Sequence, residues 1–464
     1  MTPTTGIDGA LTDTNNTAPA PISFSQALLF WLKLGFISFG GPAGQIAIMQ
    51  RELVDRRRWI SQGRFNHALN YCMLLPGPEA QQLATYIGWL MHRSWGGVVA
   101  GALFVLPSLF ILIALSWIYI RFGQVPVIAA LFYGIQCAVA AIVLHALWRV
   151  ASRVLKNPAK APILCAVAAM SFVAIEFFSI AFPWIVLVAA IMGWLGYQYA
   201  PAQFSLKGGH GAATAQHPRA LIDDDTPTPV HARFSGRRLA WVLAIGIALW
   251  ALPMLWLVMA VGWQGTLAQM GWFFTKAAMV TFGGAYAVLP YVVQGAVDQY
   301  QWLTAPQMMV GLALGETTPG PLIMVVAFVG FLGGWSKEVL GADALFAGAA
   351  LAAAVATWFT FLPSFVFILA GGPLVETTHG KLGFTAPLAA ITAAVVGVIA
   401  SLALLFFLHV VLPGGFTPGI WPHTDWVALA ILVAASLALF RYKVSVIPVI
   451  AACAVAGVLA RLVF

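Results

Sequence analysis

Thirteen long apolar segments constrain this chain more than any other feature of its sequence. Of its 464 residues, 61% are hydrophobic and only 8% are charged, and so few charges cannot cover the surface of a water-soluble globule. In hydrocarbon the backbone amides must be satisfied within helices or closed barrels, and no barrel-like alternation is present. The segments are 24–50, 65–92, 96–120, 126–150, 161–180, 182–200, 238–260, 266–294, 304–333, 343–370, 384–411, 424–440 and 444–463. We therefore predict an all-α, polytopic membrane protein.

The chain contains the same stretch twice. A lysine, a Phe-Gly-Gly motif, a tryptophan and a Pro-Gly-Pro motif follow one another in both halves at an offset of 243 (276 − 33 and 319 − 76, for example). A Leu-Pro-Ser motif follows at an offset of 256, so the second copy carries about 13 additional residues before it (256 − 243). The pairs are Lys33 and Lys276, Phe39-Gly40-Gly41 and Phe282-Gly283-Gly284, Trp59 and Trp302, Pro76-Gly77-Pro78 and Pro319-Gly320-Pro321, and Leu106-Pro107-Ser108 and Leu362-Pro363-Ser364.

This duplication divides the chain into two repeats and a connection. We predict a disordered N-terminal tail at residues 1–23, a first transmembrane repeat at 24–200, a cytoplasmic linker at 201–237, an extra transmembrane helix at 238–261 and a second transmembrane repeat at 262–464. The tail is polar and lacks the basic and apolar regions of a cleaved signal peptide. An odd number of segments separates equivalent segments, so we expect the repeats to have inverted topology.

Basic residues predict which loops are cytoplasmic. Positive-inside counting places the N-terminus and the linker inside and the C-terminus outside. The loop from Arg51 to Arg64 would break this rule if segments 24–50 and 65–92 each span once, because its five arginines would face outward. The conflict disappears if these segments and their counterparts are re-entrant hairpins, which lowers the number of crossings from 13 to nine. Both arrangements stay open from the sequence.

The Gly-Gly and Pro-Gly-Pro motifs interrupt apolar segments. Proline removes a backbone donor and glycine permits unusual dihedral angles, so both motifs break helices. In hydrocarbon, freed backbone groups are tolerated where they line a cavity, and a half-helix N-terminus attracts anions. Simple kinks and close helix packing are the alternative. Since the motifs recur in register in two repeats, we favour a transport site.

Each repeat also carries a lysine and a carboxylate near its breaks. Lys33 and Lys276 lie seven residues before Gly40 and Gly283 in apolar runs, where burying an ammonium costs about 2.5–3.5 kcal/mol. They are predicted to bind an anion, or alternatively to extend toward the membrane interface. Glu79 follows the first Pro-Gly-Pro and Glu316 precedes the second. These carboxylates would act in coupling or gating, or alternatively would be ordinary charges at helix ends.

Other chemistries lack support in the sequence. The four cysteines form no CxxC motif, and neither a metal site nor a cofactor is predicted. No Walker lysine, HExxH or haem motif is present. The net charge of +8 belongs mostly to loops beside membrane helices, so nucleic acid is not an expected partner. A membrane-embedded enzyme would need clustered metal-binding carboxylates, whereas the acidic cluster Asp223-Asp224-Asp225 lies in the linker.

The ordered motifs resemble the chromate ion transporter family in its long, two-domain form. The resemblance is carried by the paired Phe-Gly-Gly and Pro-Gly-Pro motifs, Arg51-Glu52-Leu53-Val54 to Trp59, Leu75-Pro76-Gly77-Pro78-Glu79-Ala80 and Tyr86-Ile87-Gly88. It implies export of chromate from the cytoplasm across the inner membrane and chromate resistance. Sulfate, a similar tetrahedral dianion, is the alternative substrate. The second copy has Ala285 where Pro42 stands and Leu322 where Glu79 stands, which argues against equal roles for the repeats.

The expected transporter is not an enzyme, and it works by alternating access between its inverted repeats. Its partners would be chromate or sulfate and membrane lipid, and a homodimer is left open. The predicted anion-binding residues are Lys33, Gly40, Gly41, Gly77, Lys276, Gly283, Gly284 and Gly320, and the predicted coupling or gating residues are Glu79 and Glu316.

Overall fold

The computed structural model describes residues 19–155, 161–199, 219–227, 229–282, 284–378, 385–413 and 424–463. In these ranges the regular secondary structure is helical. No β-strand is present in them, and the one isolated β-bridge joins Ile60 to Ile222. The α-helices are α1 (Phe24–Ile37), α2 (Gly41–Gln50), α3 (Gln62–Leu74), α4 (Glu79–Phe122), α5 (Pro126–Val154), α6 (Pro162–Glu176), α7 (Phe182–Tyr199), α8 (Gly236–Val261), α9 (Thr266–Met279), α10 (Ala285–Val293), α11 (Ala305–Thr317), α12 (Val325–Ser336), α13 (Leu345–Thr378), α14 (Thr385–Val411), α15 (Trp426–Phe440) and α16 (Val446–Val463). The prediction of an all-α fold is confirmed for the described residues.

Six helical stretches in the described ranges are long and apolar enough to cross a membrane. They are Glu79–Phe122, Pro126–Val154, Phe182–Tyr199, Gly236–Val261, Ala342–Glu376 and Ala386–Val411. Large apolar side chains on their outer faces are exposed, for example Leu252 (66%) and Met259 (78%) on α8. Exposed apolar surfaces of this kind are favourable in contact with lipid and unfavourable in contact with water. The chain is therefore a membrane protein, whereas the number of its crossings stays a prediction.

The helices break at all four predicted motifs. α1 ends before Ser38 and α2 begins at Gly41, while α3 ends at Leu74 and α4 begins at Glu79. The second repeat has the same breaks between α9 and α10 and between α11 and α12. The glycines at the breaks have positive φ, a region that residues with a Cβ avoid: Gly40 (87°), Gly41 (69°), Gly77 (124°), Gly284 (98°) and Gly320 (109°). Gly283 lies outside the described residues.

Local irregularities are repeated as well, at the offset of 243. A π-helix, η2 (Arg51–Arg56), follows α2, and an equivalent π-helix, η5 (Gln294–Gln299), follows α10. Beyond them Arg58 (φ 53°) and Gln301 (φ 51°) share a left-handed backbone that such residues seldom adopt. Two unrelated segments would not share these exceptions, so the duplication seen in the motifs extends to the backbone.

The helix labelled α4 is a tight hairpin of two arms. His92 and Arg93 have non-helical dihedral angles, and a Cβ built on Gly88 would lie 2.5 Å from the carbonyl oxygen of Gly96. The two arms therefore cross backbone to backbone, which only glycine permits. In the second repeat α12 and α13 form the equivalent pair, and residues 337–344, with the short 3₁₀-helix η7 (Ala342–Ala344), connect them. The longer connection and longer arms contain the additional residues of the second copy.

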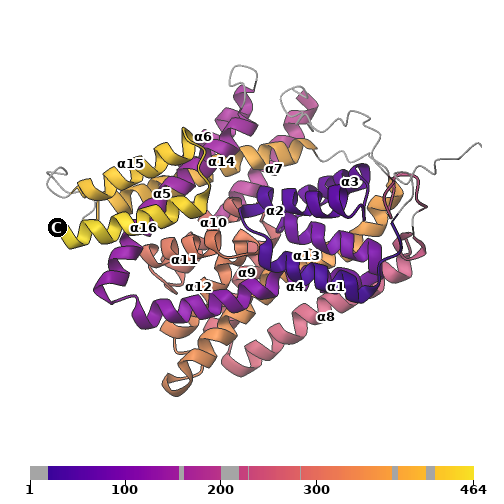
Figure 1. Ribbon diagram of the computed structural model, residues 1–464, viewed down its shortest axis with the longest axis horizontal. Helices are drawn as coiled ribbons and strands as arrows, with labels where there is room; N and C mark the ends of the chain where they lie inside the picture. The colour runs from indigo at the N-terminus through magenta and orange to yellow at the C-terminus, as the bar shows by residue number, and fades with distance from the viewer. Residues whose placement is uncertain are drawn as a thin grey trace, which may run out of the picture.

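The helices of the two repeats interlock in one elongated body (Figure 1). α1 and α3 pack on α4, while α9 and α12 pack on α13, and α4 and α13 contact each other across the repeats. At the other end α5 packs against α14, α15 and α16, and α14 packs against α6 and α7. α8 lies along α9 and α13. The four helix breaks thus lie where helices of both repeats meet, although Phe39 and Gly40 of the first break are exposed.

Candidate functional site

The four helix breaks meet in reciprocal hydrogen bonds between the repeats. The backbone N–H of Gly77 donates to the carbonyl oxygen of Thr281 at 2.7 Å, and the N–H of Gly320 donates to the carbonyl oxygen of Ser38 at 2.8 Å. Gly320 is the repeat counterpart of Gly77 and Thr281 that of Ser38, since both pairs differ by 243 positions. The same bond is therefore made twice with the repeats exchanged, as a two-fold relation requires. We call this junction of breaks, residues 38–41, 75–78, 281–282, 284 and 318–321, the crossing.

The Leu-Pro-Ser motifs make a second pair of reciprocal contacts between the repeats at the crossing. A Cβ on Gly77 would lie 2.3 Å from Ser364 Oγ, and a Cβ on Gly320 would lie 2.8 Å from Ser108 Cβ. Ser364 is the counterpart of Ser108 at the offset of 256. Each Pro-Gly-Pro therefore contacts the serine of the opposite repeat, and a side chain larger than that of glycine does not fit between them.

Buried polar atoms without a partner surround the crossing. Gln45 donates its amide to the carbonyl oxygen of Gly320 at 2.5 Å, and Gln82 donates to the carbonyl oxygen of Pro76 at 2.8 Å. Within the described residues no hydrogen bond reaches Gln45 Oε1, Gln81 Oε1, Gln82 Oε1 or Ser108 Oγ. Buried polar groups are rarely left unsatisfied, so such a cluster indicates space for water or a ligand.

Two glycines of the crossing border open space. Among the described residues, no heavy atom beyond the chain neighbours would lie within 4 Å of a Cβ on Gly41 or on its counterpart Gly284. Gly284 is buried, so the space beside it lies inside the protein. Gly40, Gly41, Gly77, Gly284 and Gly320 belong to this one junction of helix breaks, and their role in anion binding stays a prediction.

The predicted carboxylates lie beside the crossing and near two arginines of α5. Glu316 is 7% exposed and accepts a hydrogen bond from the Tyr286 hydroxyl, and the Arg149 guanidinium lies 5.7 Å from the centre of the Tyr286 ring. The cation near Glu316 is Arg149 and the cation near Glu79 is Arg153, although no ion pair joins them in the described residues. Arg149 and Arg153 are four residues apart and therefore share one face of α5. Glu79 and Glu316, one from each repeat, thus face the same basic strip.

The sequence analysis did not identify these arginines as site residues. The available signal was their spacing of four at the end of a long apolar helix, which puts both charges on one face. Their association with Glu79 and Glu316 depends on the packing of α5 against α11, between segments distant in the sequence.

The predicted lysines lie on the flanks of their repeats. Lys33 is exposed on α1 and lines a surface cavity with Gln26, Arg57 and Trp59. The Lys276 ammonium lies 5.8 Å from the centre of the Trp272 ring. In the part of the chain that the structure describes, no hydrogen bond or ion pair joins either lysine to the glycines of the crossing.

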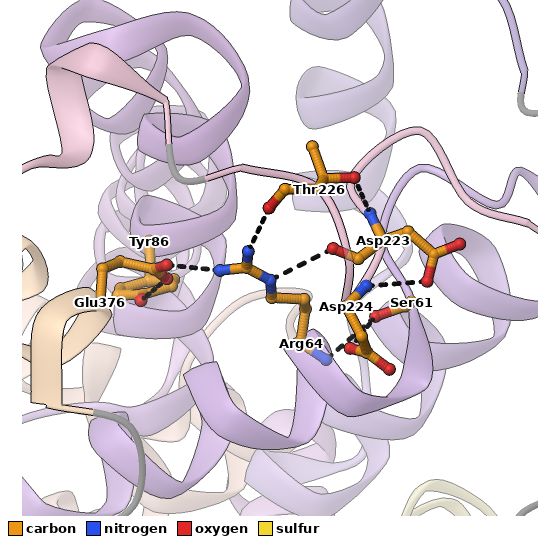
Figure 2. A network of polar contacts seen from close by, with 7 residues as sticks. All are labelled: Ser61, Arg64, Tyr86, Asp223, Asp224, Thr226 and Glu376. Carbon is orange, nitrogen blue, oxygen red and sulfur yellow. Dashed lines mark hydrogen bonds and ion pairs between the residues drawn. The ribbon is translucent and has the colours of Figure 1, made fainter.

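A buried ion pair forms a second polar centre, between α3, α4 and α13 (Figure 2). Arg64 Nη1 lies 2.5 Å from Glu376 Oε2, with side chains 10% and 1% exposed, and the Tyr86 hydroxyl donates to Glu376 Oε1. Arg64 also donates to the carbonyl oxygens of Thr226 at 2.8 Å and Asp223 at 3.3 Å, both in the linker. This network joins the first repeat, the second repeat and the linker.

The described part of the linker is attached to the loop before α3. Leu221 N–H donates to the carbonyl oxygen of Arg58 at 2.9 Å, and Ser61 N–H donates to that of Ile222 at 2.9 Å. Ser61 Oγ donates to Asp224 at 2.7 Å (Figure 2). Further along, His231 Nε2 lies 3.0 Å from the carbonyl oxygen of Trp89. The predicted linker 201–237 therefore includes a segment fixed to the first repeat, while residues 201–218 lie outside the described residues.

A resident metal ion has no evident ligand set in the described ranges, because they contain no group of three or more His, Cys, Asp or Glu side chains suited to one. The crossing instead presents backbone amides, hydroxyl and amide groups, and a nearby basic strip. These are groups that bind an oxyanion.

Comparison with known proteins gives consistent results. The family described as chromate transporter matches residues 25–194 and 268–458, and the two matches begin 243 positions apart, like the motifs. The chain is 34% identical over 391 residues to a chromate transport protein of Pseudomonas aeruginosa, covering 83% of this chain and 82% of that protein. It is 30% identical over 385 residues to a chromate transport protein of Cupriavidus metallidurans, again covering 83% and 82%. No solved structure matches.

Proposed function

The chain belongs to the chromate transporter family, and on that premise we propose that it exports chromate from the cytoplasm across the inner membrane and so confers chromate resistance. The observation that carries this proposal is the crossing, where breaks of equivalent helices exchange the same hydrogen bonds. Broken helices at matching positions of two repeats are a typical ion-binding arrangement of secondary transporters. The membrane potential favours outward movement of a dianion by about 4–5 kcal/mol at 100 mV, since each charge contributes about 2.3 kcal/mol.

The anion would bind in the space beside Gly41 and Gly284. The free backbone N–H groups at the starts of α2 and α10 lie at the N-termini of half-helices. The dipoles of these half-helices attract negative charge there. The unpartnered Ser108 hydroxyl can donate to an oxyanion. Gln45 and Gln82 can present their amide NH₂ groups by rotating, since the two ends of such an amide have nearly the same shape.

Charge for binding a dianion would come from Arg149 and Arg153. These guanidiniums lie near the carboxyl groups of Glu316 and Glu79, without an ion pair to either in the described residues. An arriving dianion would compete with the carboxylates for the arginines, and a proton taken up by a displaced carboxylate would couple transport to protons. Lys33 and Lys276 are less well placed for this task, because Lys33 is exposed on the outer face of α1.

Contacts of the linker favour the re-entrant arrangement. Positive-inside counting places residues 201–237 in the cytoplasm, and the Leu221–Arg58 and Ser61–Ile222 hydrogen bonds fix the 58–61 loop to that linker. That loop would then also be cytoplasmic, with its arginines inside. Segments 24–50 and 65–92 would enter and leave the membrane on the cytoplasmic side.

Inverted repeats follow from the same arrangement. If segments 24–50 and 65–92 are re-entrant from the cytoplasm, their counterparts 266–294 and 304–333 enter from the outside, and nine segments cross. The two-fold exchange at the crossing would then have its axis in the membrane plane. Movement of one repeat relative to the other about this axis would expose the same glycines alternately to the two sides.

The direct test is uptake of radiolabelled chromate into everted inner-membrane vesicles that contain the chain, compared with vesicles that lack it. Export in the cell corresponds to energy-dependent accumulation in these vesicles. A protonophore, which dissipates the proton gradient and the potential together, reports whether uptake depends on the proton-motive force, and excess sulfate reports selectivity. Uptake equal to that of control vesicles at verified protein levels would refute chromate export, and complete suppression by equimolar sulfate would favour sulfate as the substrate.

A further inference from the structure

Two cavities occupy equivalent places on the flanks of the repeats. The first, of about 420 Å³, is lined by Ile22, Gln26, Leu29, Phe30, Lys33, Arg57 and Trp59. The second, of about 330 Å³, is lined by Trp263, Gln264, Gln269, Trp272, Gln299 and Tyr300. Gln26 and Gln269, Leu29 and Trp272, and Arg57 and Tyr300 are counterparts at the offset of 243. The duplication has therefore produced two versions of one cavity.

The two versions differ in charge. In the first, the Arg57 guanidinium lies 4.9 Å from the centre of the Phe30 ring and 5.2 Å from that of Trp59. In the second, Tyr300 takes the place of Arg57 and stacks on Trp302 with ring centres 4.7 Å apart. Lys33 adds another positive charge to the lining of the first cavity, whereas the residues that line the second are neutral and its nearby cation, Lys276, lies over the Trp272 ring.

The positive charges of the first cavity are only partly balanced. Arg57 has one carboxylate nearby, with Nε 3.9 Å from Glu52 Oε2, and Glu52 is also paired with Arg56 at 2.6 Å. In the described ranges Lys33 forms no hydrogen bond or ion pair. Lys33, Arg56 and Arg57 therefore have one carboxylate, Glu52, between them.

The surroundings of this cavity are those of a lipid-facing surface. Lys33 lies on α1 between Leu29 (65% exposed) and Phe36 (51% exposed), one turn away on either side. At the edge of the cavity, the carbonyl oxygen of Ile22 lies 3.0 Å from Nε2 of His92, which is at the turn of the α4 hairpin. Trp89 of the same hairpin contacts His231 of the linker through its carbonyl oxygen. The cavity thus joins an apolar helix face to the linker side of the molecule.

We propose that this cavity binds the phosphate group of an anionic phospholipid. Lys33 and Arg57 neutralise the phosphate, Gln26 donates to it, and the acyl chains lie along Leu29 and Phe36. A free ammonium beside hydrocarbon is unfavourable, so a fixed phosphate supplies the charge that the protein lacks. The neutral cavity of the second repeat does not select anionic lipid. This inference does not depend on which ion the crossing transports.

Lipid binding is measured by native mass spectrometry of the purified full-length chain, delipidated and then incubated with phosphatidylglycerol or phosphatidylcholine. The chain is expected to retain phosphatidylglycerol about tenfold more strongly than phosphatidylcholine, and Lys33→Gln is expected to lose about that factor. Lys33→Arg keeps the charge and should keep the preference. Lys276→Gln, the equivalent change in the second repeat, is the matched control and should leave the preference unchanged.

Three results would overturn the proposal. These are equal retention of the two lipids, retention of phosphatidylglycerol by Lys33→Gln at the level of the parent chain, and an equal loss in Lys276→Gln. Inorganic phosphate or chromate added during incubation tests the other source of the same chemistry. Displacement of phosphatidylglycerol by these ions at millimolar concentration would identify an oxyanion site and refute a lipid site. Because retention is measured without transport, failure of chromate export leaves this test intact.

Discussion

The backbone N–H of Gly77 and the carbonyl oxygen of Thr281, 2.7 Å apart, join the Pro-Gly-Pro break of the first repeat to the Phe-Gly-Gly break of the second. The equivalent bond between Gly320 and Ser38 closes the pair. Both bonds satisfy backbone groups that the broken helices leave free, which is how interrupted helices are tolerated at membrane depth. The helix breaks of the two repeats therefore stabilise one another, in addition to bonds within one repeat such as that from Gln82 to Pro76.

Gly77→Ala is expected to disrupt the crossing. The new Cβ would lie 2.3 Å from Ser364 Oγ, at a φ of 124°, so strain of the backbone adds to an overlap that costs about 1–3 kcal/mol. Thermal stability of the purified protein should fall and chromate uptake should be lost. Adding Ser364→Ala removes the overlapping oxygen and should restore part of the stability.

Gly262→Ala is the matched control for this change. Gly262 also has a positive φ (76°), but a Cβ there meets no heavy atom within 4 Å. Its substitution tests the backbone strain alone and should cost less, with uptake retained. Equal losses in the two variants would mean that the contact with Ser364 is unimportant.

Arg149→Gln and Arg153→Gln are expected to impair transport. Each removes a charge from the strip near Glu316 and Glu79. The hydrogen bond that each arginine would donate to the bound dianion would contribute about 1.5–3 kcal/mol, as is typical of a hydrogen bond to a charged group. The KM for chromate should rise about ten- to hundredfold in vesicle uptake. Arg149→Lys should be milder, since the charge is kept.

Arg121→Gln serves as the control for the arginines, because Arg121 is an exposed residue in the last turn of α4. It should transport normally. Lys33→Gln and Lys276→Gln belong in the same series, as they test the original prediction that the lysines bind the anion. Loss of uptake in the lysine variants, together with normal uptake in the arginine variants, would return the site to the lysines.

Glu376→Gln is expected to lower the stability of the folded protein strongly. It leaves Arg64, 10% exposed, without its carboxylate, and breaking a buried ion pair by removing one partner costs about 3–5 kcal/mol. Replacing both, as Arg64→Met with Glu376→Leu, should cost less than the single change. The pair of Glu52 with Arg56, whose side chain is 65% exposed, is the control, and Arg56→Gln should cost less than about 1 kcal/mol. Thermal unfolding in a double-mutant cycle provides the measurement, and additive effects of the two buried changes would argue against coupling.

Labelling of single cysteines is expected to place Arg57→Cys and Arg93→Cys in the cytoplasm. The linker hydrogen bonds near Arg58 support that side for the first position, and the re-entrant arrangement requires both to be inside. The four native cysteines are replaced beforehand. Phe122→Cys, between α4 and α5, should react only from outside. Labelling of residue 57 from outside would establish that segment 24–50 spans the membrane.

Local sequence signals were sufficient for the helices and their breaks. Runs of apolar residues predict membrane helices because burial in hydrocarbon depends mainly on composition and length, and proline and glycine act on their own backbone. The positions of Gly40, Gly77, Gly284 and Gly320 at helix ends could therefore be predicted from their neighbours in the sequence. The boundary between the two arms of α4 was also predicted, between segments 65–92 and 96–120.

Long-range charge pairs could not be predicted in the same way. Glu376 lies beyond the predicted end of segment 343–370, and Arg64 was assigned to a loop, yet the two form the most buried ion pair in the described residues. Their association depends on α13 of one repeat reaching α3 of the other. No periodicity within either segment records that contact.

The sequence by itself determined the class of the protein, its duplication and the places where its helices break, because each of these depends on the composition or the backbone chemistry of neighbouring residues. Only the tertiary structure decided which groups those breaks contact. It paired Gly77 with Thr281 and Gly320 with Ser38, set Arg149 near Glu316 and left Lys33 on an outer face. The physical reason is that a free amide or a charge requires a partner without specifying which one, and the packing of the two repeats makes that choice.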